Sequence, residues 1–111
     1  MQEVRPWGTF KVLLDLEKYK VKELVVHPQS KLSLQKHNLR SEYWAVTDGA
    51  GIAIVNDETI DIRVYDTVLV PKGAKHRIIN PYDEPLVILE VQLGECIESD
   101  IERFEDDYGR V

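Results

Sequence analysis

The sequence predicts a small all-β domain built as an antiparallel sandwich or barrel. Turn-forming residues recur roughly every ten residues, and the segments between them alternate apolar and polar side chains. No stretch shows a sustained helical period. With 111 residues, 43% of them hydrophobic, the chain is long enough for one domain, residues 1–111, with its own core.

Turn residues mark the ends of each expected strand. Residues 19–26 alternate well and stop at His27-Pro28, because proline restricts the backbone of the residue before it. Residues 1–8 are expected to be irregular, and the tail is expected to hold at most one short helix, capped by Ser99. The expected strands are residues 9–14, 19–26, 32–36, 42–47, 52–55, 59–64, 67–70, 75–80 and 86–93.

The net charge of −6 is concentrated near the C-terminus. Between Glu95 and Asp107 there are seven acidic residues and one base, Arg103, which by themselves sum to −6. The remaining residues are balanced and offer no basic face, which argues against nucleic-acid binding. An anionic small substrate is still compatible if a few Arg and Lys side chains gather in one pocket.

Cys96 is the only cysteine, so the chain has no intrachain disulfide, as expected in a reducing compartment. The sequence has no membrane-length apolar run and no signal-like N-terminus. These features predict a soluble, cytoplasmic protein without a membrane partner.

Two segments carry the side chains of a candidate metal site. Gln35 and His37 alternate, so on a strand they point to the same side, and Glu42 follows across a short polar turn. His76 lies just past a tight corner of proline and glycine. An amide oxygen, two imidazoles and a carboxylate suit a borderline divalent transition metal, with positions left for a substrate.

The same segments resemble the two motifs of the cupins. On the first motif fall His37, Glu42 and Gly49, with Gln35 at its first His and Gln29 at its leading Gly. On the second fall Pro71, Gly73, His76 and Asn80, with Tyr65 at its leading Gly. The resemblance implies a single-domain cupin, a double-stranded β-helix or jelly-roll barrel.

A narrower resemblance covers almost the whole chain. Its segments are Arg5-Pro-Trp-Gly, Tyr19-Lys-Val-Lys, Leu32-Ser-Leu-Gln-x-His, Arg40-Ser-Glu-x-Trp44, Pro71-x-Gly-x-Lys-His-Arg, Leu89-Glu-Val-Gln92 and the stretch from Phe104 to Arg110. They are similar to the type II mannose-6-phosphate isomerase domain. In that family the domain is often the C-terminal half of a bifunctional enzyme with a mannose-1-phosphate guanylyltransferase, which this chain does not contain.

That resemblance implies a metal-dependent isomerase that interconverts mannose 6-phosphate and fructose 6-phosphate. The implied ligands of the divalent metal (Zn, Mn, Fe, Co or Ni) are Gln35, His37, Glu42 and His76. We expect the metal to stabilise an enediolate, with Glu90 as base, since Glu90 and Gln92 share a strand face. Candidates for the sugar phosphate are Lys22, Arg40 and Arg110, and Arg40 is also a catalytic candidate.

The sequence departs from this family where histidines are usual, at positions 38, 39 and 43, which here hold Asn, Leu and Tyr. If positions 37 and 39 were the ligands, Leu39 would remove one. An alternative is therefore a non-catalytic cupin that binds a sugar phosphate or nucleotide sugar, or a partner subunit that has lost activity. A third is another cupin enzyme, such as an iron-dependent dioxygenase. Exposed strand edges and an apolar outer sheet face would favour a homodimer.

Overall fold

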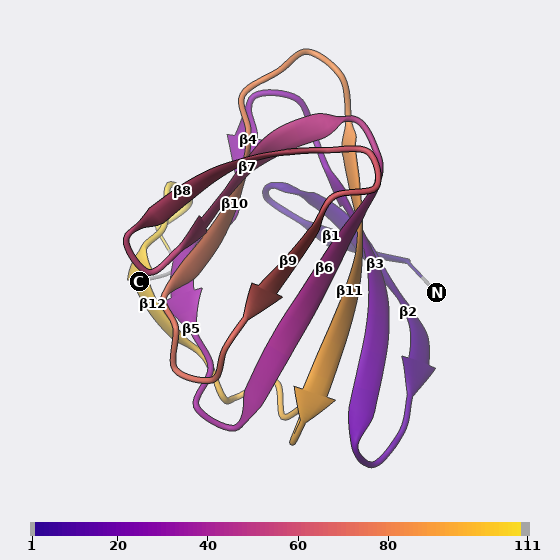
Figure 1. Ribbon diagram of the computed structural model, residues 1–111, viewed down its shortest axis with the longest axis vertical. Helices are drawn as coiled ribbons and strands as arrows, with labels where there is room; N and C mark the ends of the chain where they lie inside the picture. Colours follow the sequence, from indigo (N-terminus) through magenta and orange to yellow (C-terminus); the bar gives the residue numbers. More distant parts are fainter. Residues whose placement is uncertain (1, 110–111) are drawn as a thin grey trace.

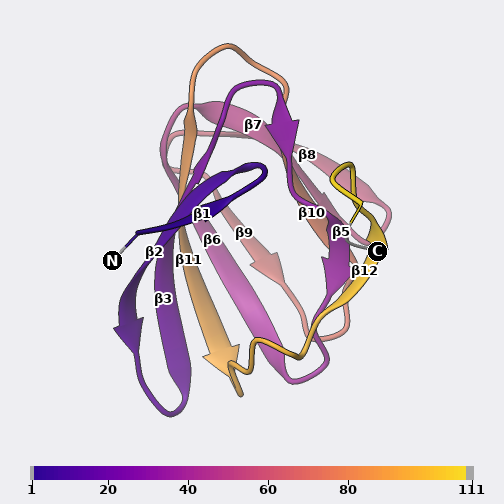
Figure 2. The same cartoon turned by 180° about the vertical axis from the view of Figure 1, so that it is seen from behind.

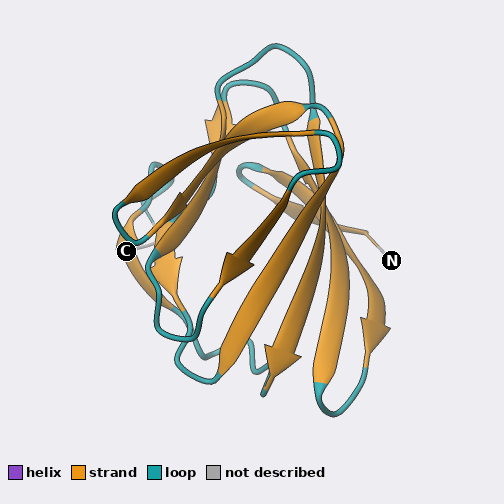
Figure 3. Cartoon of the chain, viewed as in Figure 1, coloured by secondary structure: helices purple, strands orange, loops and turns teal. Residues whose placement is uncertain are grey.

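The computed structural model describes residues 2–109, which form two antiparallel sheets facing each other as a jelly-roll barrel (Figure 1). One sheet has the order β1-β2-β3-β11-β6-β9, and the other β12-β5-β10-β7-β8 with β4 paired to β10. The described residues contain strands and loops but no helix (Figure 3). The strands are β1 (Gln2–Arg5), β2 (Gly8–Asp15), β3 (Tyr19–Val26), β4 (Ser30–Lys31), β5 (Leu34–Lys36), β6 (Arg40–Asp48), β7 (Ala50–Val55), β8 (Glu58–Arg63), β9 (Thr67–Val70), β10 (His76–Asn80), β11 (Leu86–Gly94) and β12 (Glu102–Glu105).

The expected all-β barrel is confirmed, and the strands lie close to their expected positions, with β3 matching residue for residue. The N-terminal segment differs from the expectation. Gln2–Arg5 is not irregular but pairs antiparallel with β2. Pro6 and Trp7 form the turn between them, where a missing N–H costs the ladder no hydrogen bond.

The C-terminal segment differs as well, because no helix starts at Ser99. Residues 102–105 form β12, which pairs with the edge of β5 and sets Arg103 opposite Gln35. Arg77 fixes this strand, since its Nη1 donates to Glu105 Oε2 at 3.2 Å. A free strand edge carries unpaired backbone groups that an added strand satisfies.

The acidic tail is a strap that pairs with bases from the barrel. It runs from β11 on one sheet across one end of the barrel to β12 on the other sheet (Figure 2). Four of its acids form ion pairs with basic residues of the first 77 positions: Glu98, Glu102, Glu105 and Asp107. The acidic residues that are concentrated near the C-terminus are therefore partly neutralised by basic residues of the barrel.

Inward side chains change from apolar to polar along the strands. At one level of the sheet that contains β2, β3, β11 and β6, the side chains that lie opposite one another are Phe10, Leu24, Ile88 and Val46. The next two levels carry charged and polar groups inward. Opposite one another across β3, β11 and β6 lie Lys22, Glu90 and Trp44, and then Lys20, Gln92 and Glu42. The apolar end forms the core, and the polar end forms the site.

Candidate functional site

Three side chains predicted as metal ligands meet inside the barrel. His37 follows β5, Glu42 lies on β6 and His76 opens β10, so the two sheets both contribute. The three side chains are buried, and their nearest ligand atoms all lie within 4.8 Å of one another. Nε2 of His37 is 3.2 Å from Glu42 Oε2, and Nε2 of His76 is 3.8 Å from Glu42 Oε1.

Backbone carbonyls orient both imidazoles. Nδ1–H of His37 donates to the carbonyl of Asp100 at 2.6 Å, and Nδ1–H of His76 donates to the carbonyl of Ala74 at 3.0 Å. With the proton on Nδ1, each Nε2 keeps its lone pair and faces the Glu42 carboxylate. This is the tautomer that metal-binding histidines commonly adopt.

The protonation states also suit a cation. Burial lowers the pKa of His37, even though Glu42 acts in the opposite direction, so the imidazole is neutral at pH 7. Burial by itself would raise the pKa of Glu42, but His76, His37, Arg40 and a hydrogen bond from Trp44 outweigh it and lower the pKa. Two imidazoles and one carboxylate form a donor set that fits a divalent transition metal.

Arg40 lies against the same cluster. Its Nε and Nη2 are 3.1 Å and 3.0 Å from Glu42 Oε2, and Nη2 is 3.1 Å from His37 Nε2. The guanidinium therefore faces two of the three candidate ligand atoms and neutralises the buried carboxylate. A metal ion bound to those two atoms would take over this neutralising role.

The fourth predicted ligand, Gln35, lies at the edge of the cluster. It is directly opposite His76 on the neighbouring strand, but its Nε2 donates to Ser33 Oγ at 3.0 Å. Its role as a ligand stays a prediction. Position 39 does not supply a ligand instead, because the Leu39 side chain has no donor atom and is 41% exposed.

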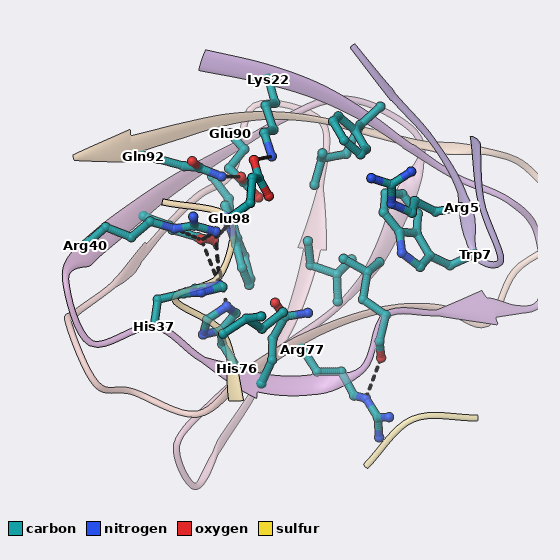
Figure 4. A pocket seen from close by; sticks show the side chains of 18 of the residues that line it. Arg5, Trp7, Lys22, His37, Arg40, His76, Arg77, Glu90, Gln92 and Glu98 are labelled. Atoms are coloured by element: carbon teal, nitrogen blue, oxygen red, sulfur yellow. Dashed lines mark hydrogen bonds and ion pairs between the residues drawn. The ribbon is translucent and has the colours of Figure 1, made fainter. Parts of the chain in front are cut away.

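A cavity of about 140 Å³ opens beside the cluster (Figure 4). At about 30 Å³ per water molecule, that is room for roughly five waters. Lys22 and Arg40, which were expected to bind the sugar phosphate, line this cavity, and so does Glu90, the expected base. Arg110, the remaining candidate, lies outside the described residues.

Glu90 is strongly perturbed. Its side chain is 7% exposed, and burial, with the nearby Glu42, raises its pKa to about 8 in spite of Lys22. Gln92 Nε2–H donates to Glu90 Oε1 at 2.5 Å. A carboxyl group of this kind is protonated at pH 7 and can donate a hydrogen bond.

Two buried polar atoms of the cavity wall have no hydrogen-bond partner in the described part of the chain: Gln92 Oε1 and Arg103 Nε. One accepts and the other donates, and leaving either unpaired in the interior costs free energy. Sequence reasoning missed Arg103 as well as Glu98 and Lys20. Lys20 lies two residues before Lys22 on β3, so strand alternation was a signal that could have found it. Glu98 and Arg103 lie on a segment without any recognisable pattern.

An antiparallel jelly-roll barrel with a His-Glu-His cluster inside defines the protein as a cupin. The solved structures agree. A cupin-2 domain from Rhodospirillum rubrum matches with a TM-score of 0.74 and 24% identity, covering 85% of this chain and 68% of that one. A conserved Klebsiella pneumoniae protein with a double-stranded β-helix domain matches with a TM-score of 0.80 and 16% identity, covering 94% and 90%.

Within the cupins, the chain belongs to the family described as mannose-6-phosphate isomerase C-terminal, whose model matches residues 1–106. It is 39% identical to the Xanthan biosynthesis protein XanB of Xanthomonas campestris pv. campestris, over 96% of this chain and 23% of XanB. It is also 39% identical to the Mannose-1-phosphate guanylyltransferase ManC of Salmonella typhimurium, over 96% of this chain and 22% of ManC. The chain thus spans less than a quarter of the length of these relatives.

This coverage corrects the expected function. The prediction that the chain by itself is a mannose-6-phosphate isomerase is wrong as it stands. The relatives are much longer proteins, and this chain matches only one domain of each. The family membership holds, but it does not show that this chain has the activity of the longer proteins. The described residues contain no helix that could span a membrane, and the cytoplasmic location stays a prediction.

Proposed function

We propose that this chain is a sugar-phosphate-binding cupin domain that holds a divalent metal beside the sugar. The observation that carries the proposal is the cavity next to the His-Glu-His cluster, whose wall has unpaired polar atoms as well as cationic side chains. Both features are needed for a ligand that combines hydroxyl groups with a negative charge.

The metal would be held by His37, Glu42 and His76, with Gln35 as a further candidate. When bound, it supplies a Lewis acid that attracts the oxygen atoms of a sugar. Displacing Arg40 from Glu42 would free a guanidinium within the cavity, and a guanidinium is well suited to an oxyanion.

Other residues of the cavity wall could bind the hydroxyl groups and the phosphate of a sugar phosphate. Gln92 Oε1 can accept a hydrogen bond from a sugar hydroxyl, and Arg103 Nε can donate one. Lys22 supplies positive charge for the phosphate, and neutral Glu90 can donate to an oxygen. The roles of Glu90 as a base and of Arg40 in catalysis stay predictions, and the proposal assigns binding rather than turnover to this chain.

Calorimetric titration tests the proposal. The purified chain, loaded with Zn²⁺ or Mn²⁺, is titrated with mannose 6-phosphate, mannose 1-phosphate and unphosphorylated mannose. We expect both phosphates to bind more tightly than mannose, and binding to weaken when the metal is removed with a chelator. Equal affinities for mannose and its phosphates, or no binding at all, would contradict the proposal, and so would interconversion of mannose 6-phosphate and fructose 6-phosphate by the chain alone.

A pair of histidine substitutions tests the metal centre separately. His76→Ala removes a candidate ligand and should lower the metal affinity by at least roughly tenfold. His27→Ala is the matched control, because His27 is exposed and lies outside the cluster. Metal content measured by mass spectrometry after dialysis reads out both variants, and an equal loss in the two would refute the assignment.

A further inference from the structure

We propose that the ammonium groups of Lys20 and Lys22 form an oxyanion subsite beside the cavity, whose wall includes Lys22 and Glu98, and that the Glu98 carboxylate occupies this subsite until a phosphate group displaces it. The inference rests on the proposed function and adds to it the place where the phosphate binds and an internal competitor for that place.

The two lysines are unusual because they point into the barrel. Lys20 is 7% exposed and Lys22 is 6% exposed, on the same inward face as Leu24 and Val26. Lysines are rarely buried to this degree without an anion. Nζ of Lys22 also lies 4.5 Å from the centre of the Phe10 ring, and this cation–π contact helps to hold the side chain in place.

Glu98 supplies that anion with a single oxygen atom. Its Oε1 is 3.3 Å from Lys20 Nζ. The same Oε1 is 3.2 Å from Lys22 Nζ, and Figure 4 shows Glu98 and Lys22 side by side. Asp15 is a more distant second partner of Lys20, at 3.8 Å. Burial by itself would raise the pKa of Glu98, but the two lysines lower it, so the carboxylate is ionised at pH 7.

The two lysines and Glu98 differ in burial, and this difference favours replacement of the Glu98 carboxylate by another anion. The cations are buried, whereas the Glu98 side chain is 67% exposed and can swing into solvent at little cost. A phosphate group offers three oxygens and up to two negative charges, whereas Glu98 carries one charge and contacts both lysines through one of its two oxygens. The subsite is therefore better matched to a phosphate than to the group that fills it.

The segment that carries Glu98 is anchored at both of its ends. The backbone N–H of Glu95 donates to the Leu39 carbonyl at 3.1 Å. The Asp100 carboxylate accepts hydrogen bonds from the N–H groups of Asn38 and Leu39 at 3.0 Å and 2.9 Å. The Glu98 side chain can thus leave the lysines while the Asp100 carbonyl continues to orient His37.

Inorganic phosphate tests this subsite without a sugar or a metal. Its affinity is measured by calorimetry at pH 7 and low salt, with a chelator present, for the unmodified chain, Glu98→Gln and Glu95→Gln. Removing the competing carboxylate should tighten phosphate binding roughly threefold to tenfold. Glu95→Gln is the matched control, because it removes the same charge from an exposed residue of the same segment and should change the affinity by less than about twofold.

Two further measurements make the result decisive. In the double variants Lys20→Gln/Glu98→Gln and Lys22→Gln/Glu98→Gln the gain should disappear, and thermal unfolding checks that each variant is folded. A Glu98→Gln chain that binds phosphate no more tightly than Glu95→Gln overturns the inference. If Glu98→Gln gives no such gain and the unmodified chain still binds mannose 6-phosphate tightly, the subsite is refuted but the proposed function is not. If Glu98→Gln binds inorganic phosphate more tightly but the chain binds no mannose phosphate, the proposed function is refuted but the subsite is not.

Discussion

Glu90 lies opposite Lys22 on β3 and Trp44 on β6, and burial, with the nearby Glu42 carboxylate, raises its pKa to about 8. In the unfolded chain the same group titrates near 4.5. Between these two pH values the folded state keeps a proton that the unfolded state has lost. Stability contributed by this group therefore falls as the pH rises from about 4.5 to about 8.

Replacing Glu90 by Gln should remove this fall. In urea unfolding with a chelator present, we expect the unmodified chain to lose roughly 2–4 kcal/mol more between pH 5 and pH 8 than Glu90→Gln does. Glu58→Gln, on an exposed face of β8, is the control and should follow the unmodified chain. Parallel pH profiles for Glu90→Gln and the unmodified chain would show that Glu90 is not a neutral acid in the folded protein.

Tyr65 forms the turn between β8 and β9 and has a φ of 74°, in the left-handed region. The cupin motif has glycine at this position, and at position 29, where Gln29 has a φ of 57°. At both positions the backbone therefore adopts the left-handed conformation that glycine favours. A side chain with a Cβ atom in this conformation costs on the order of 1 kcal/mol.

Tyr65→Gly should consequently stabilise the protein. The side chain is 86% exposed, so little packing is lost, and the relief of strain exceeds the added entropy of the unfolded chain. We expect a gain of roughly 0.5–1 kcal/mol in the free energy of unfolding, measured by urea titration. Tyr65→Ala removes the same ring but keeps the Cβ atom, so an equal gain in that variant would rule out backbone strain as the cause.

The outer face of the sheet that contains β3, β11, β6 and β9 is apolar over several strands. Tyr43 lies opposite Leu69 on β9 and Val91 on β11, and Leu93 lies opposite Tyr19 on β3. Of these side chains, Leu69 is 57% exposed and Tyr43 is 42% exposed. An uncovered apolar face of this kind is typical of a protein interface, and the homodimer expected from the sequence stays a prediction.

Light scattering after size-exclusion chromatography tests the dimer. We expect the unmodified chain to show twice its 12.8 kDa mass, and Leu69→Glu to shift the mass toward the monomer, because it places a charge within the apolar face. Tyr82→Glu, in the loop between β10 and β11, is the control for an added surface charge and should leave the mass unchanged. A monomeric unmodified chain would contradict the prediction.

Much of this molecule follows from local pattern. Alternation and turn chemistry placed β3, β6 and β11, and the spacing of His37, Glu42 and His76 singled out the three groups that meet inside the barrel. These features are readable because the period of a strand and the residues of a turn depend on neighbours in sequence.

Other features were decided only by the tertiary structure. Ser99 and the acids that follow it suggested a helix, but the free edge of β5 and the guanidinium of Arg77 made residues 102–105 a strand. The burial of Lys20 and the position of Glu98 against it depend on partners 78 positions apart in the chain. The sequence by itself determined the barrel and its cluster of possible metal ligands. Only the tertiary structure decided that Lys20 and Lys22 pair with Glu98, because residues so far apart in the chain meet only after folding.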